Sequence, residues 1–192
     1  MKKIGKLFVL ACFIAIAHIN VNAQGYKLPK YEKFKLSNGL TVYLMEQHDV
    51  PVISVNAILP AGAISDGNKA GLASLTASAL KHGTTSYTKA TIDEKLDFIG
   101  ASINVSASKE YANLSSKFAS KDQKLVLNII KELLRNPTFN EEEFKKEKSR
   151  MIVGLDQQKE SPSSVIGSYF NKILYGNHVY GNITNGTKES VE

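Results

Sequence analysis

Residues 52–59 read VISVNAIL, and polar and apolar side chains alternate along them. Ile53 and Val55 fall on one side of an extended chain, and Ser54 and Asn56 fall on the other. A period of two is typical of a β-strand with one covered face and one polar face. This stretch therefore predicts a sheet that is covered by other elements on one side only.

Further strands and helices are expected before and after this stretch, in the order strands, two helices, a hairpin and then helices. Ser37-Asn38-Gly39 predicts a hairpin before it, and Pro60-Ala61-Gly62 ends it. Thr91, with Glu94 three residues later, has the spacing of a capping box and predicts a helix start. The expected strands cover residues 34–36, 40–45, 52–59, 102–107 and 112–118, and the expected helices cover residues 69–81, 91–100, 121–134, 140–159 and 162–175. Strands joined by tight turns predict an α+β fold, an antiparallel sheet with helices packed on one face.

The expected helix at residues 69–81 has an apolar side and a serine side. Leu72, Leu75, Ala79 and Leu80 recur at helical spacing beside the serines. This arrangement predicts that these four side chains face the core of the domain.

The first 23 residues have the three parts of a signal peptide. Met1 to Lys6 is basic, Leu7 to Ala17 is apolar, and Val21-Asn22-Ala23 offers small residues to a signal peptidase. The apolar part is shorter than the roughly 20 residues of a membrane-spanning helix. We expect cleavage after Ala23 and export to the periplasm or the medium without a stable membrane span, and acylation at Cys12 is the alternative. The mass of the mature N-terminus tests this expectation.

The composition of the remaining chain argues against nucleic-acid binding and against stabilisation by cysteine. Without Lys2, Lys3 and Lys6, 21 basic residues stand against 18 acidic ones, and these few surplus charges are scattered. Such a charge argues against nucleic-acid binding. Cys12 is the only cysteine of the sequence, so the mature chain has neither a disulfide nor a thiolate metal site.

Six short motifs occur along the mature chain. They are LSNGLTV at residues 36–42, AGA at 61–63 ahead of Asp66, GLA at 71–73, GT at 83–84, FKKEK at 144–148 and YG at 180–181. Their order and spacing resemble the pitrilysin or insulinase family of metallopeptidases, which are inverted zincins. The resemblance implies that residues 24–192 form the N-terminal peptidase-like domain of that family. The chain stops within an expected helix start, which leaves open that this domain is truncated at its C-terminal end.

The resemblance also shows what is missing. In that family the helix after the Gly-Leu-Ala motif carries His-x-x-Glu-His, in which two histidines bind zinc and the glutamate activates water. Alignment without a gap places Ser74 and Ser78 at the histidines, Ala77 at the glutamate and Gly154 at the third ligand, while Glu147 matches a supporting acid. The resemblance therefore implies no catalytic residue, no metal ligand and no cofactor here, although zinc is the cofactor of active members.

The remaining candidate residues offer little chemistry. Ser74, Ser78 and His82 have the spacing of one helix face, which would suit a nucleophile or a weak metal site. The interpretation that we favour is that the serines fill the space of a lost site and that His82 is a polar residue near a helix C-terminus. His48 and His178 have no ligand spacing to another donor, and we expect both on the surface.

The resemblance implies a function without catalysis. In that family two halves built from domains of this shape enclose the substrate, and one half commonly lacks zinc. We therefore expect a non-catalytic homologue that pairs with a zinc-bearing homologous subunit, or a second homologous domain, in peptide or protein degradation or processing. Two alternatives stay open: a stand-alone peptide-binding or scaffold protein that uses a sheet edge, and a fragment of a larger metallopeptidase whose zinc site lies downstream.

Overall fold

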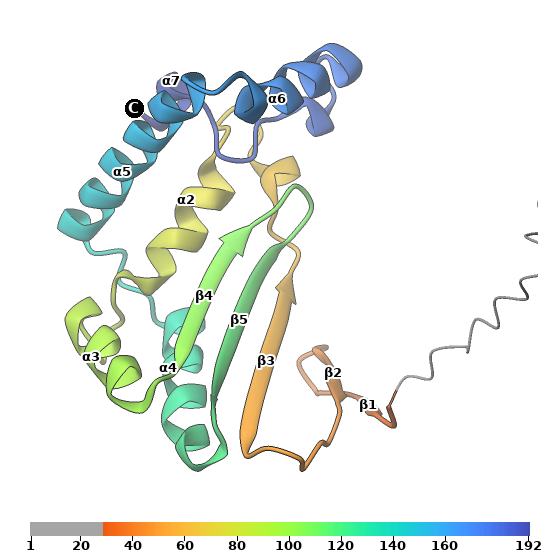
Figure 1. Ribbon diagram of the computed structural model, residues 1–192, viewed down its shortest axis with the longest axis vertical. Helices are drawn as coiled ribbons and strands as arrows, with labels where there is room; N and C mark the ends of the chain where they lie inside the picture. Colours follow the sequence, from red (N-terminus) through yellow and green to blue (C-terminus); the bar gives the residue numbers. More distant parts are fainter. Residues whose placement is uncertain (1–28) are drawn as a thin grey trace, which may run out of the picture. The chain divides into compact units, whose positions relative to one another are not determined.

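The computed structural model describes residues 29–192 (Figure 1), and the predicted signal peptide lies outside them. The chain divides into two compact units, one that ends at His48 and one that begins at Asp49. The first holds an antiparallel hairpin of β1 (Glu32–Lys35) and β2 (Thr41–Leu44). Within residues 29–192, no helix has the length and apolar character needed to cross a membrane.

The second unit is built on a three-stranded antiparallel sheet. Its strands are β3 (Val52–Leu59), β4 (Ser102–Ala107) and β5 (Ala112–Ala119), and β5 lies in the middle. Two register pairs fix the alignment, Ile53 with Phe118 and Val105 with Leu114. The strand expected at residues 52–59 is therefore found with the expected bounds.

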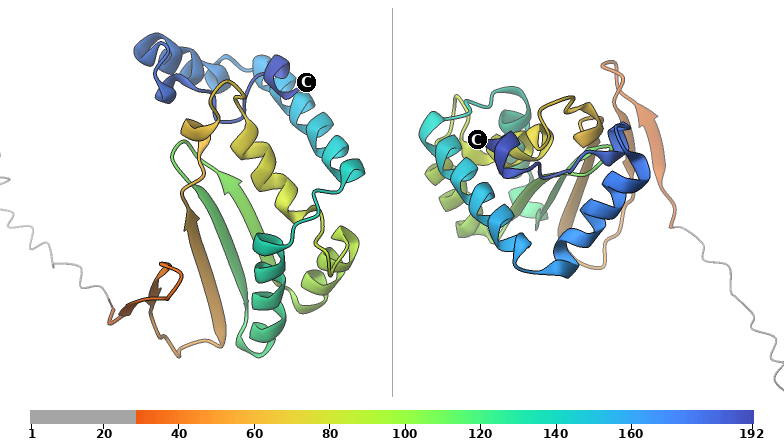
Figure 2. Two further views of the ribbon diagram at one scale, coloured as in Figure 1. Left: turned by 180° about the vertical axis from the view of Figure 1, so that it is seen from behind. Right: turned by 90° about the horizontal axis from the view of Figure 1, so that it is seen from above.

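Helices complete the second unit. They are η1 (Ala63–Ser65), α2 (Leu72–Ala79), η2 (Leu80–His82), α3 (Lys89–Ile99), η3 (Ser120–Asp122), α4 (Gln123–Arg135), α5 (Glu141–Lys159), α6 (Pro162–Tyr175), η4 (Val179–Gly181) and α7 (Lys188–Val191). α5 packs along α2, and α7 packs against α5 (Figure 2). In Figure 1, α6 lies at the opposite end of this unit from α4.

The core lies between the sheet and the helices α2, α3 and α4. The largest fully buried side chains are Leu114 of β5 and Val126, Ile129 and Leu133 of α4. Burial of one such side chain stabilises the fold by about 1.5–3 kcal/mol, so this layer dominates the hydrophobic stabilisation. The predicted α+β fold, with helices on one face of an antiparallel sheet, is confirmed.

The other face of the sheet carries mostly serine and asparagine. The register places these side chains in rows across the three strands. The rows are Ser54, Lys117 and Ser102, then Asn56, Ser115 and Asn104, then Ile58, Asn113 and Ser106. Seven of these nine side chains are neutral and polar, and we call this surface the serine–asparagine face.

Two predictions about the helices are wrong. Thr88, not Thr91, is the N-cap of α3, and its side chain accepts a hydrogen bond from the Thr91 amide at 3.1 Å. Leu72 was expected in the core but is 48% exposed, because α2 begins only at this residue and its first turn projects beyond the sheet. Ala79 is fully buried and Leu80 packs against the core, as predicted, whereas Leu75 is only partly buried and does not belong to the core cluster.

Candidate functional site

Asp66 fixes the start of α2, the helix on which the expected zinc motif would lie. Its two carboxylate oxygens accept hydrogen bonds from the amides of Gly71 and Ala73, both at 2.9 Å, and the residue is 6% exposed. Gly71 has φ of 94°, a conformation that favours glycine. A carboxylate also suits the positive end of the helix dipole. Asp66 therefore anchors α2, a role that the sequence analysis did not assign to it.

The motif positions meet where α2 packs against α5. Ser78 and Gly154 line one cavity of about 280 Å³, together with Asn185. The Ser74 hydroxyl donates a hydrogen bond to Oδ1 of Asn185 at 3.0 Å. Ala77 points the other way, is 3% exposed and belongs to the core cluster. We call the meeting place of Ser74, Ser78 and Gly154 the α2–α5 junction.

The donors at the α2–α5 junction do not fit a zinc ion. Zinc sites in proteins use imidazole, thiolate and carboxylate donors, whereas Ser74 and Ser78 offer neutral hydroxyls and Gly154 offers no side chain. The Ser74 hydroxyl is moreover engaged with Asn185. Within residues 29–192, no three side chains of His, Cys, Asp or Glu are grouped so that they could hold a metal ion. The absence of zinc from the protein in solution remains a prediction, which metal analysis of the purified chain tests.

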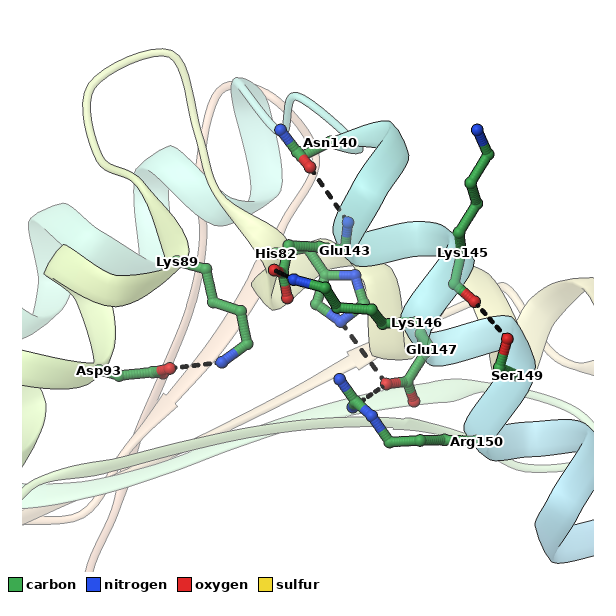
Figure 3. Close-up of polar contacts among 10 residues, drawn as sticks. All are labelled: His82, Lys89, Asp93, Asn140, Glu143, Lys145, Lys146, Glu147, Ser149 and Arg150. Atoms are coloured by element: carbon green, nitrogen blue, oxygen red, sulfur yellow. Dashed lines mark hydrogen bonds and ion pairs between the residues drawn. The ribbon is translucent and has the colours of Figure 1, made fainter.

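A polar cluster lies just beyond the C-terminal end of α2, at η2. His82 is buried, with Nε2 3.7 Å from Oε2 of Glu147, and Nη1 of Arg150 donates to the same oxygen at 2.5 Å (Figure 3). The sequence predicts an ordinary polar residue at a helix end for His82, and the family resemblance implies a supporting acid for Glu147. The structure brings the two together from segments 65 residues apart. No local pattern signals such a contact.

Burial controls the charge of His82. Desolvation lowers the pKa of His82 below its ordinary value of 6.5, and Arg150 and Lys89 lower it further. Glu147 and Glu143 raise the pKa but do not reverse the shift. The ring is therefore neutral at neutral pH.

We expect the stability of the chain to fall as the pH drops below 6.5. The unfolded histidine then binds a proton that the folded ring resists, so the free energy of unfolding decreases by up to about 1.4 kcal/mol per pH unit until the folded pKa of His82 is passed. Urea unfolding between pH 7.5 and pH 5 measures this slope. His82→Gln should remove this component, whereas His48→Gln at an exposed position should keep it. An unchanged slope in His82→Gln would show that another group is responsible.

The other two histidines within residues 29–192 lie on the surface, as predicted. His48 is exposed in the first unit, with Nε2 3.7 Å from Oε2 of Glu46. His178 is exposed beside the rings of Tyr175 and Tyr180, and its Nδ1 accepts a hydrogen bond from the Tyr180 amide. Neither shares a cavity with the α2–α5 junction, and the structure gives neither a part in it.

Known proteins of the same fold are found by sequence and by structure. A Helicobacter pylori (strain ATCC 700392 / 26695) protein named non-peptidase homolog YmxG is 29% identical over 167 residues, or 81% of this chain and 39% of that protein. A Bacillus subtilis (strain 168) protein named uncharacterized zinc protease YmxG is 24% identical over 161 residues, or 83% of this chain and 39% of that protein. The solved peptidase M16 inactive domain from Pseudomonas fluorescens has a TM-score of 0.80 and 26% identity, and the match covers 84% of this chain and 40% of that one.

The names of these similar proteins include both a zinc protease and proteins without peptidase activity. Two of the three proteins are described as a non-peptidase homologue or an inactive domain, and this chain resembles them. The chain spans about two fifths of the length of the relatives that it matches. The sequence profile described as Insulinase (Peptidase family M16) matches residues 41–188. Motifs, fold and profile agree, and the chain belongs to the insulinase family, peptidase family M16.

Proposed function

We propose that this chain is a non-catalytic domain that pairs with a homologous, zinc-bearing domain or subunit in peptide or protein degradation or processing. The observation that carries the proposal is the α2–α5 junction, where two hydroxyls and a glycine stand at the positions of the zinc ligands. Ala77, at the position of the general base, has no group that takes a proton from water. Members of this family typically work as paired homologous subunits. A domain that lacks catalytic residues can then still help to enclose the substrate.

An exposed apolar face on α6 supports the pairing. Ile166, Phe170 and Ile173 are 67%, 60% and 83% exposed, and their spacing places them on one side of the helix. Exposed apolar surface of this kind marks protein–protein contacts. We assign this α6 face to the homologous domain, because members of the family pair homologous subunits.

Capture of the tagged chain from its own cells tests the pairing. We expect a co-purifying protein, identified by mass spectrometry, that carries the His-x-x-Glu-His motif. The complex should cleave a fluorogenic peptide in a chelator-sensitive manner, and the chain alone should not. The double variant Phe170→Ser/Ile173→Ser should lose most of the captured protein, because it removes the apolar contact. Phe98→Ser, at a position on α3 that is 90% exposed, is the matched control and should retain it.

Two outcomes would contradict the proposal. One is capture that never yields a protein with a zinc motif, while the chain alone binds extended peptides, which would favour the stand-alone binding protein. The other is chelator-sensitive turnover by the purified chain itself. If Phe98→Ser lost as much captured partner as Phe170→Ser/Ile173→Ser, the loss would not be specific to α6, and the assignment of the contact to α6 would fail.

A further inference from the structure

Two of the six sequence motifs, AGA at residues 61–63 and YG at 180–181, lie outside the α2–α5 junction. The structure brings both of them to the tip of the β4–β5 hairpin. This tip lies at the same end of the sheet as α6 (Figure 1). The two motifs therefore meet beside the helix that carries the exposed apolar face.

The AGA motif lets the chain after β3 lie directly against the hairpin tip. A Cβ on Gly62 would stand 2.3 Å from the carbonyl carbon of Glu110, and glycine is the residue that permits so close an approach of two backbones. The amide of the next residue, Ala63, donates a hydrogen bond to the carbonyl oxygen of Ser108 at 3.0 Å. These backbone contacts hold the tip in a fixed place beside η1.

Two charged side chains of the tip hold the segment that contains the YG motif. Nζ of Lys109 donates to the carbonyl oxygens of Tyr180 and Asn182, at 2.5 and 3.3 Å. The Tyr180 hydroxyl donates to the carboxylate of Glu110. Hydrogen bonds that involve a charged group are stronger than those between neutral groups. We call these contacts of Lys109 and Glu110 with Tyr180 and Asn182 the clasp.

The position of α6 depends on the element that the clasp holds. Within the described part of the chain, no residue of α6 is buried, and the main contacts of the helix are with η4 and α5. Most helices are stabilised by packing an apolar face onto a core, and α6 lacks this support. Since η4 contains Tyr180, the clasp fixes the element on which α6 rests.

We propose that Lys109 and Glu110 are positioning residues for the α6 face. The clasp holds η4, and η4 holds α6, so that Ile166, Phe170 and Ile173 are presented to the homologous domain in one orientation. A surface that is ordered before binding binds more tightly, because less conformational entropy is lost. The inference rests on the pairing proposed above for the use of the α6 face, whereas the ordering of α6 is a property of the free chain.

Amide hydrogen exchange of the free chain tests the ordering. Lys109→Met and Tyr180→Phe each remove one arm of the clasp, so α6 and η4 should exchange about tenfold faster. β5 should keep its wild-type rate, which distinguishes this effect from a general loss of stability. Lys109→Arg keeps a charged donor and should stay close to wild type. Tyr111→Phe on the same hairpin and Lys124→Met on the exposed surface of α4 are matched controls and should leave the rates unchanged.

Binding of the protein captured by the wild-type chain tests the positioning. Lys109→Met and Tyr180→Phe should each bind it about tenfold more weakly, although both keep every side chain of the α6 face. Lys109→Arg and the two controls should bind as wild type does. Unchanged exchange of α6 in both clasp variants would overturn the inference, and so would faster exchange with partner binding at the wild-type level. If the wild type captures no partner, the pairing fails by itself, and the exchange rates still decide whether the clasp orders α6.

Discussion

Replacement of Ser74 and Ser78 by histidine and of Gly154 by glutamate should turn a chain that binds no stoichiometric zinc into one that binds about one zinc ion. The two histidines would lie one turn apart on α2, and the glutamate would face them from α5. Two imidazoles, a carboxylate and water complete a tetrahedral site of the kind that zinc prefers. Metal analysis of wild type and triple variant, both purified without chelator, measures the gain.

The structure favours this change at each of the three positions. Ser78 and Gly154 line the same cavity, and a Cβ added at Gly154 would meet nothing within 4 Å. Ser74 would lose only its hydrogen bond to Asn185. Ala77 stays unchanged, because a glutamate at this core position would bury a carboxylate and destabilise the fold. We therefore expect zinc binding without peptidase activity, since the general base is still absent.

Bound zinc should also stabilise the triple variant. A ligand at 100 times its Kd raises the free energy of unfolding by about 2.7 kcal/mol, which a thermal scan with and without zinc detects. Ser163→His/Gly167→His is the matched control, with the same spacing on α6 but no designed third ligand. Stoichiometric zinc in the wild type would overturn the non-catalytic interpretation. A folded triple variant without zinc would show that α2, or the third ligand, is aligned in the wrong register.

Asp66→Ala should destabilise the fold strongly. The change removes both hydrogen bonds to the start of α2 and leaves the amides of Gly71 and Ala73 without their acceptor. Hydrogen bonds to a charged group contribute about 1.5–3 kcal/mol each, so we expect the free energy of unfolding to fall by about 3 kcal/mol or more. Urea unfolding at pH 7.5 measures the change.

Two further variants separate capping from simple loss of charge. Asp66→Asn keeps one oxygen acceptor and should fall between wild type and Asp66→Ala. Asp97→Ala removes an exposed carboxylate from α3 and should alter stability by no more than about 0.5 kcal/mol. If Asp66→Ala proved as mild as Asp97→Ala, the start of α2 would not depend on this carboxylate.

Elements with a strong repeating pattern were predictable from the sequence, and their ends were less so. The alternation at residues 52–59 gave both bounds of β3, and Pro162 marked the first turn of α6. The start of α3 was misplaced because Thr88 and Thr91 are both suitable caps and lie three residues apart. Lys89 and Ala90 are good helix formers, so the helix extends back to the earlier threonine.

The candidate site was predictable only as a set of motif positions. Ser74, Ser78 and Gly154 were named from spacing, and the structure brings Ser78 and Gly154 to one cavity. Asn185 and the burial of His82 could not be foreseen, because both depend on contacts between segments far apart in the chain. The prediction that Leu72 lies in the core failed for another reason. Helical spacing identifies the apolar face of a helix, but it does not show which turns of the helix lie over the sheet.

The serine–asparagine face also bears on how the sheet assembles. A slip of β4 by one residue against β5 would turn Ile103 and Val105 into water and drive Asn104 into the core. Each exposed aliphatic side chain forfeits about 1.5–3 kcal/mol of burial, and the buried amide lacks partners. A misaligned hairpin is thus short-lived and can separate and pair again. The difference between the two faces therefore specifies the strand register, because only one alignment buries the apolar side chains and leaves the polar ones in water.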